Sequence, residues 1–237
     1  MKATILYLYH DLMNLYGDNG NVRIMEKRLR DQGFDVEIVR KTITDENISF
    51  EGFDLIYCGS GTESKRAAAV KHLKLFEKEF SKAVSEGTPM LFTGNSWGML
   101  GKTITGLYGD KIEGLGLFGF DLTEEIKKRF TGDAVLTADD FADPFVGFIN
   151  KCDVIEGFDG YKFKVSKTIG QIPYEGDGVR MENLYGISLI GPVLVKNPFF
   201  AEYLTKLITE RRQAPYKEIE YYHEKKGYEM TLKALTE

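Results

Sequence analysis

The sequence predicts an α/β protein with an open mixed, mostly parallel, twisted sheet that is flanked by helices and carries added antiparallel strands. Apolar strands alternate with amphipathic helices through residue 100, in the order β-α-β-β-α-β-α, which favours a parallel sheet with helices on both faces. Glycine-rich loops follow directly on two of the apolar strands. From Gly114 to Ile190 the pattern changes to short strand-like pieces separated by turn residues, which predicts the antiparallel part.

In the first hundred residues, β-branched and aromatic runs predict buried strands. Val22, Met25 and Leu29 repeat at helical spacing up to Gly33, which we interpret as a C-terminal cap. A second apolar stripe, closed by Gly87, predicts one long helix. The expected strands are residues 3–9, 35–40, 54–58 and 89–93, and the long helix spans residues 63–86.

The second half begins with antiparallel strands, which we expect to extend the same α/β core and not to form a separate domain. Strands are expected at residues 133–136 and 146–149, with turns at 139–140, 159–160 and 176–178. The chain ends in a helix over residues 199–212 and a weaker helix over residues 218–235, broken near Gly227.

Composition and charge exclude several classes of protein. The 237 residues are expected to form one domain, residues 1–237. They are 43% hydrophobic and 28% charged, as in a folded globular protein, and the net charge of −5 argues against a mainly electrostatic nucleic-acid binder. No apolar run is long enough for a membrane span, and the N-terminus is interpreted as a strand, not a secretion signal. The two cysteines are too few for a disulfide scaffold, so we expect a cytoplasmic protein.

Two strand ends are the candidate sites, since ligands of open α/β sheets bind at the carboxyl ends of the strands. The backbone N–H groups of Gly59, Ser60 and Gly61 are suited to an anion or a developing oxyanion. Residues 93–98 resemble a nucleophile elbow, a sharp strand-to-helix turn that projects its central side chain over the sheet edge. A working elbow needs a nucleophile at its tip and a base such as histidine nearby.

Six motifs in order give the chain a resemblance to a known family. They are LMNLYGDNGN, YCGSG, LFTGNSWGMLG, KKRFTGD, VGFINK and ISLIGPVLVKNP. In their order and spacing they resemble the CobB/CobQ-type class I glutamine amidotransferase domains, which implies a flavodoxin-like amidotransferase fold. Within that family the chain looks closest to the amidotransferase subunit of lipid II isoglutaminyl synthase.

The resemblance also identifies what is missing. At the elbow the family pattern has a cysteine nucleophile where this chain has Gly94, and in the late motif it has a histidine where this chain has Ile190. Glycine tolerates the left-handed torsions that an elbow imposes. The loss of both members of the thiolate–imidazole pair predicts a subunit without glutaminase activity.

Other family positions are retained. Arg129 matches an arginine that resembles a clamp for the glutamine α-carboxylate, a role suited to its fork of donors, and Gly59, Ser60 and Gly61 match the oxyanion-hole loop. Asn95, next to the elbow tip, joins them as a substrate-binding position. The resemblance implies a Mur-ligase-like ATP-dependent partner that amidates D-glutamate of the peptidoglycan stem peptide. The spacing of the histidines offers no metal site, and no cofactor is expected in this chain.

Two alternatives stay open. The chain is an active glutaminase if Cys58 or Ser96 serves as a displaced nucleophile, although we favour core packing for Cys58 and a helix N-cap for Ser96. Core packing is also expected for Cys152, and none of the three histidines occupies the late-motif position. The other alternative is a sensor that binds glutamine or a related amino acid through Arg129 and the glycine loop.

Overall fold

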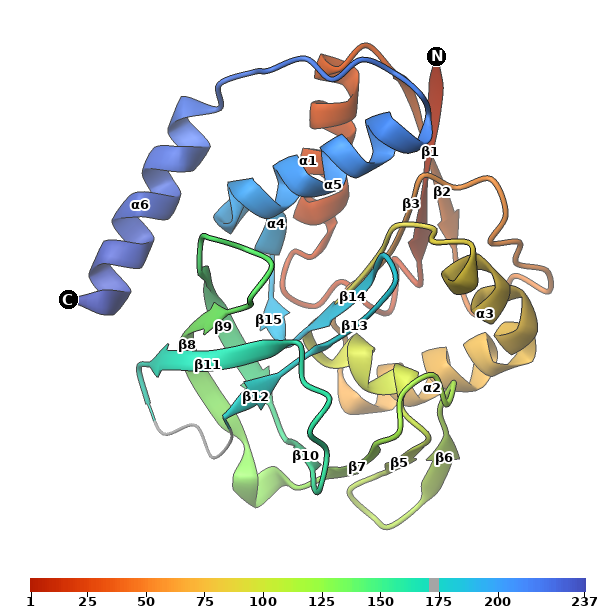
Figure 1. The fold of residues 1–237 in the computed structure, drawn as a ribbon. Coiled ribbons are helices and arrows are strands. Elements are labelled where there is room, and N and C mark those ends of the chain that lie inside the picture. Colours follow the sequence, from red (N-terminus) through yellow and green to blue (C-terminus); the bar gives the residue numbers. More distant parts are fainter. Residues whose placement is uncertain (171–174) are drawn as a thin grey trace.

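The predicted parallel sheet lies at the centre of the computed structural model, which describes residues 1–170 and 175–237 (Figure 1). Its strand order is β13-β14-β4-β3-β1-β2. Neighbouring strands pair in parallel except for the β13–β14 pair, which is antiparallel. The strands are β1 (Lys2–Leu8), β2 (Asp35–Lys41), β3 (Leu55–Cys58), β4 (Met90–Thr93), β13 (Val179–Met181) and β14 (Leu184–Ile187).

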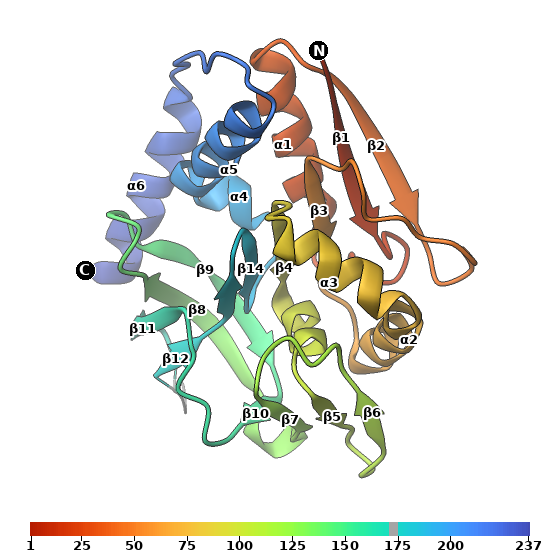
Figure 2. The ribbon, with the colours of Figure 1, turned by 45° about the vertical axis from the view of Figure 1, so that its right-hand side comes forward.

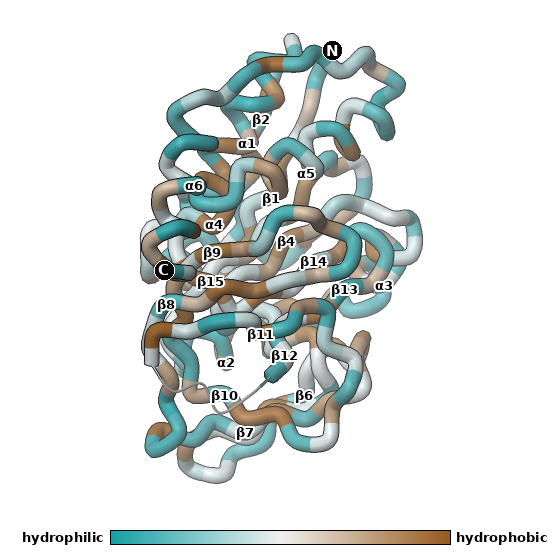
Figure 3. The backbone as a smooth tube through the Cα atoms, turned by 60° about the vertical axis from the view of Figure 1, so that its left-hand side comes forward, coloured by the Kyte–Doolittle hydropathy of each residue, from teal (hydrophilic) through white to brown (hydrophobic). Residues whose placement is uncertain are grey.

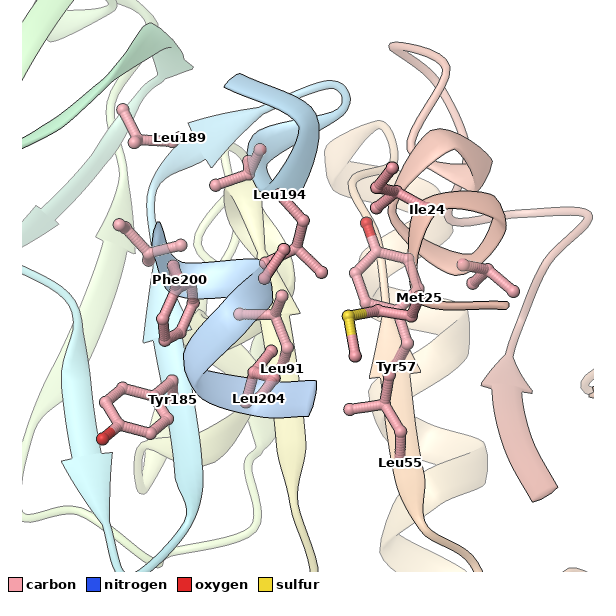
Figure 4. Packing of buried hydrophobic residues seen from close by; sticks show 14 of the residues in the cluster. Ile24, Met25, Leu55, Tyr57, Leu91, Tyr185, Leu189, Leu194, Phe200 and Leu204 are labelled. Atoms are coloured by element: carbon pink, nitrogen blue, oxygen red, sulfur yellow. The ribbon is translucent and has the colours of Figure 1, made fainter. Parts of the chain in front are cut away.

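Helices cover both faces of this sheet, as predicted (Figure 2). The helices are α1 (Asn19–Asp31), α2 (Glu63–Leu73), α3 (Glu77–Ser85), α4 (Val193–Lys196), α5 (Pro198–Arg211) and α6 (Tyr222–Thr236). Met25 of α1 and Leu204 of α5 are buried against one face, together with Tyr57 and Leu91 of the sheet (Figure 4). Helices α2 and α3 bury a second core against the other face. Helices therefore shield both faces of the central sheet from water, as is usual for a parallel sheet.

The long helix expected over residues 63–86 is divided in the structure, so that prediction was wrong in its continuity. A 3₁₀ turn, Lys74–Phe76, separates α2 from α3. Lys74 Nζ donates to the carbonyl oxygen of Gly114 and pairs with Glu77, which holds the turn in place. The apolar stripe continues from α2 into α3 across the short turn, so periodicity alone does not reveal the break.

The middle of the chain forms two further sheets beside the central one. The antiparallel prediction is confirmed for each pair except β5–β7, which is parallel. Apolar residues follow the strands β9 and β15, whereas the outer turns are mostly hydrophilic (Figure 3). One sheet has the order β10-β7-β5-β6, with β5 (Thr103–Thr105), β6 (Lys111–Glu113), β7 (Asp121–Glu124) and β10 (Asp153–Ile155). The other has the order β12-β11-β8-β9-β15, with β8 (Phe130–Thr137), β9 (Phe145–Lys151), β11 (Phe163–Thr168), β12 (Gly176–Asp177) and β15 (Leu189–Ile190).

Two local predictions in this half were wrong. Residues 176–177, expected in a turn, form the short strand β12, which pairs with β11. Helix α6 continues through Gly227, where a break was expected. An interior glycine costs a helix only about 1 kcal/mol. Burial of Tyr228 and Leu235 against β8 and β9 offsets this cost.

Candidate functional site

The elbow lies at the end of β4, an inner strand of the central sheet between β14 and β3. Gly94 follows the strand directly and has a φ of +62°, in the left-handed region that disfavours side chains. A Cβ atom placed on Gly94 would overlap Ser60 Oγ, and it would lie 2.7 Å from Ser60 Cβ and 3.0 Å from Ile190 Cγ2. The structure therefore brings together the tip of the elbow, the glycine loop and the late motif.

Ile190 supplies only hydrocarbon to this junction. It is 5% exposed, ends β15 and faces Phe148 of β9 across an antiparallel pair. The following loop is held from the other side of the sheet, because Asn21 Nδ2 donates to the Gly191 carbonyl oxygen at 2.8 Å. The Ile190 side chain thus points at the place where a Cβ atom of residue 94 would lie, and an aliphatic group there accepts no proton.

Hydrogen bonds within the protein already occupy donors of the glycine loop. The Gly61 N–H group donates to Asn95 Oδ1 at 3.1 Å, and Asn95 Nδ2 donates back to the Gly61 carbonyl oxygen at 2.8 Å. The Ser60 N–H group donates to the carboxylate of Asp18. Gly59 is required by close packing, since a Cβ atom there would lie 2.6 Å from Asp18 Cβ. The loop is built to approach the elbow closely, and two of its N–H groups bind protein atoms.

Asp18, for which the sequence predicted no role beyond its place in the LMNLYGDNGN motif, is a buried carboxyl beneath this loop. Its side chain has no exposed surface. Burial raises its pKa to about 6, and hydrogen bonds from the Tyr16 and Ser60 N–H groups and from the Thr93 hydroxyl partly oppose the rise. The Thr93 hydroxyl also bonds Tyr57 Oη at 2.8 Å, which extends the polar network from the β1–α1 loop to β3 and β4. The available signal was the YGD-x-GN motif, which contains Asp18.

Arg129 lies in a separate small polar cavity of about 140 Å³. Its guanidinium group pairs with Glu63 Oε1 at 2.5 Å and donates to Asn150 Oδ1 at 2.9 Å. Gly61 and Asn95 line the same cavity, so three of the predicted binding residues meet there. Gly59, Ser60, Gly94 and Ile190 do not line it. The cavity is lined by Leu15, Tyr16, Gly61, Thr62, Glu63, Asn95, Arg129, Asn150, Lys151, Cys152 and Asp153.

A buried ion-pair cluster contacts the backbone of the elbow. Arg66 is fully buried, and it pairs with Glu124 at 2.5 Å and with Asp153 at 2.7 Å. Its guanidinium group also donates to the Asn95 carbonyl oxygen at 3.3 Å. The cluster therefore links α2, the elbow and the β10-β7-β5-β6 sheet. Sequence reasoning missed it, because its members are distant along the chain and carry no local signature.

The two alternative nucleophiles are engaged in packing. Cys58 has no exposed surface, and burial raises the pKa of its thiol, which keeps it protonated and unreactive. Ser96 Oγ donates to the Thr93 carbonyl oxygen at 2.8 Å and to the Cys58 carbonyl oxygen at 3.1 Å. The expected N-cap for Ser96 was wrong, because its hydroxyl donates to strand-end carbonyls and does not accept from a helix N–H group. Core packing of Cys58 is confirmed.

The remaining thiol and two of the histidines do not belong to the elbow junction. Cys152 is 1% exposed, and burial raises the pKa of its thiol to about 12. Its S–H group contacts Glu63 at 3.3 Å. His72 bonds Tyr9 Oη and the Asp45 carbonyl oxygen, both at 3.1 Å, and His223 lies in α6. Among the residues the structure describes, no three His, Cys, Asp or Glu side chains group to hold a metal ion. None of the described helices is long and apolar enough to cross a membrane.

Comparison with known proteins identifies the family of this chain. A model of the CobB/CobQ-like glutamine amidotransferase domain matches residues 4–186. The lipid II isoglutaminyl synthase (glutamine-hydrolyzing) subunit GatD of Staphylococcus aureus is 30% identical over 223 residues, which covers 91% of this chain and 88% of the relative. GatD of Streptococcus pneumoniae is 26% identical over 206 residues, with coverage of 83% and 76%.

Two solved structures share the fold. PurLQS from Thermotoga maritima has a TM-score of 0.53 and 13% identity, and the match covers 90% of this chain and 100% of that chain. A glutamine amidotransferase from the same organism has a TM-score of 0.53 and 13% identity, with coverage of 98% and 91%. This chain belongs to the CobB/CobQ-like glutamine amidotransferase family and is a homologue of GatD, the glutamine amidotransferase subunit of lipid II isoglutaminyl synthase.

Proposed function

We propose that this chain is an amidotransferase-fold subunit of a lipid II isoglutaminyl synthase-type complex and that it does not itself hydrolyse glutamine. The observation that carries the proposal is the junction of Gly94, Ser60 and Ile190. The volume beside the elbow tip that a nucleophilic side chain needs is taken by the Ser60 hydroxymethyl group. An aliphatic side chain stands where the base is required. Acyl transfer through a thioester needs both a thiolate and a proton acceptor in contact.

The subunit works beside a Mur-ligase-like ATP-dependent partner in the cytoplasm, where it has a structural or regulatory role. The curated relatives are each named as a subunit of a glutamine-hydrolysing synthase, which supports an assembly with a second chain. The acceptor, D-glutamate of the peptidoglycan stem peptide, is bound by the ligase. In this scheme free ammonia, and not glutamine, supplies the nitrogen.

The test is an assay of the assembled complex with glutamine or with ammonium as the nitrogen source. We expect amidation with ammonium and no ammonia release from glutamine. Glutamine hydrolysis that is abolished by Cys58→Ala or by Ser96→Ala would show a displaced nucleophile and would refute the proposal. Hydrolysis that survives both changes would refute it as well.

Restoration of the missing groups provides a stricter test of the site. Gly94→Cys with Ile190→His returns the two family residues, but the new side chain at position 94 meets Ser60 Oγ. We therefore expect an electrophilic glutamine analogue to label the triple variant that also carries Ser60→Gly, and to label the double variant much less. The variant with Ser60→Gly and Ile190→His alone is the matched control, and it should not react. Equal labelling of control and triple variant would show that the thiol at position 94 is not the reacting group.

A second candidate function, amino-acid sensing, is favoured by the Arg129 cavity. An α-amino acid carries one carboxylate and one ammonium group, and the cavity offers the opposite charges on Arg129 and Glu63, which pair with each other. Calorimetry with glutamine tests this function. Saturable heat that Arg129→Gln removes supports a sensor, whereas absence of heat supports a purely structural or regulatory subunit.

A further inference from the structure

A second polar cleft, of about 240 Å³, lies at the carboxyl ends of β1 and of the edge strand β2 in the central sheet. It is bounded by α1, by the ends of β1 and β2, and by the loop that joins β1 to α1. None of its lining residues lines the Arg129 cavity, so the two are distinct. The lining residues are Tyr7, His10, Asn14, Asn19, Val22, Arg23, Glu26, Ile38 and Arg40.

Two arginines face this cleft without a carboxylate partner. Arg23 comes from α1 and Arg40 from β2, and neither makes a side-chain hydrogen bond or an ion pair within residues 1–170 and 175–237. Every other arginine of the chain makes one or both. Glu26 also lines the cleft, but its carboxylate is paired with Arg30 at 2.9 Å. The cleft is therefore a concentration of positive charge in a chain of net charge −5.

A buried hydroxyl group at the same place also lacks a partner. Tyr7 is 3% exposed, and its Oη atom makes no hydrogen bond within the described part of the chain. A buried unpaired hydroxyl costs free energy that a bound acceptor would recover. Burial raises the pKa of this phenol, with a smaller opposing effect from Arg40, so the group stays protonated and able to donate. The imidazole of His10 lies beside it, with ring centroids 6.0 Å apart.

The donors at this cleft are side chains, because the first turn of α1 is already satisfied. The Asn19 N–H group donates to Asn14 Oδ1, and the N–H groups of Gly20 and Asn21 donate to loop carbonyls. Two guanidinium forks, a phenol and an imidazole offer more donors than the two oxygens of a carboxylate can accept. A phosphate group presents more acceptor oxygens and up to two negative charges, and arginine suits it particularly well.

We propose that this cleft binds a phosphate group, as the free ion or as the head of a small phosphate monoester, with Arg23 and Arg40 neutralising its charge and the Tyr7 hydroxyl donating to one oxygen. The size agrees with this ligand class. The volume is below the roughly 300 Å³ at which pockets for larger ligands begin, so one anionic head group and little more fits. The proposal concerns a different site from the elbow and does not depend on the function proposed above.

Calorimetry of the full chain at low ionic strength tests the proposal, with inorganic phosphate, glucose 6-phosphate and malonate as probes. We expect saturable heat with inorganic phosphate and at least about tenfold weaker binding by Arg40→Gln, as for a lost hydrogen bond to a charged group. Arg180→Gln is the matched control. It removes the same charge from an arginine that pairs with Asp140 elsewhere, and it should bind as the unmodified chain does. Tighter binding of glucose 6-phosphate would identify the monoester, and tighter binding of inorganic phosphate would identify the free ion.

Tyr7→Phe keeps the ring and the charge and removes only the unpaired hydroxyl, so it should fold normally. We expect it to weaken phosphate binding several-fold, since one donor is lost. Three results would overturn the proposal: no saturable heat with either phosphate probe, malonate binding as tight as that of phosphate, or equal losses in Arg40→Gln and Arg180→Gln. Unchanged phosphate binding by Tyr7→Phe would overturn the assigned role of the phenol.

Discussion

The buried carboxyl of Asp18 makes the stability of this protein depend on pH in a predictable direction. In the unfolded chain the group titrates near its ordinary pKa of 3.8, and in the folded chain near 6. Between these values the folded protein retains a proton that the unfolded chain has released. Stability therefore falls as the pH rises through this window. The two pKa values differ by about 2 units, and each unit corresponds to about 1.4 kcal/mol, so the full loss is about 3 kcal/mol. Most of this loss occurs between pH 4 and pH 7.

Asp18→Asn removes this titration and keeps the shape of the side chain. At pH 4 a protonated carboxyl and an amide are nearly equivalent, so the variant and the original chain should have similar free energies of unfolding. At pH 7 the variant should have gained about 3 kcal/mol relative to the original. Urea unfolding followed by the fluorescence of Trp97, the one tryptophan of the chain and 1% exposed, measures both values.

The matched control is Asp11→Asn, which changes the net charge equally at an exposed position of the same loop. Its stability difference should be the same at both pH values to within a few tenths of a kcal/mol, as for surface substitutions. A difference for Asp18→Asn that stays flat between pH 4 and pH 7, or that changes in the opposite direction, would refute the reasoning. It would mean that the hydrogen bonds to the carboxylate outweigh its desolvation.

Three further predictions follow from the same region. Gly94→Ala should destabilise the chain by at least about 2 kcal/mol, because left-handed strain of about 1–2 kcal/mol adds to the overlap with Ser60. In a double-mutant cycle followed by urea unfolding, Ser60→Gly in the same chain should recover the part due to the overlap. Additive effects of the two changes would contradict the overlap. Arg66→Met should lower the free energy of unfolding by about 3–5 kcal/mol, since two buried carboxylates lose their cation. A change below about 1 kcal/mol would show that these carboxyl groups are neutral in the folded chain. Cys58 and Cys152 should react with a thiol reagent only after unfolding, because both are buried and burial raises the pKa of both thiols. Rapid labelling of the native chain would contradict this prediction.

Much of the fold could be predicted from the sequence because its signals are local. A buried strand such as β3 is a short apolar run, and α1 repeats apolar residues at helical spacing, so each is recognisable within a few residues. The sequence predictions were wrong where one hydrophobic pattern is compatible with two different structures. The apolar stripe over α2 and α3 fits one straight helix as well as two helices joined by a 3₁₀ turn. The contact of Lys74 with a distant carbonyl accompanies the second arrangement.

The candidate site divides in the same way. The residue types at the elbow tip and in the late motif, Gly94 and Ile190, can be read from the order of the motifs, because motif order is a property of the chain. Three other features become visible only in the folded chain: Ser60 fills the space beside that tip, Asp18 is buried beneath the loop, and Arg23 and Arg40 share a cleft. The physical reason is that desolvation, overlap and charge pairing depend on distances between atoms far apart in sequence. Those distances exist only once the strands have paired and the helices have packed on them.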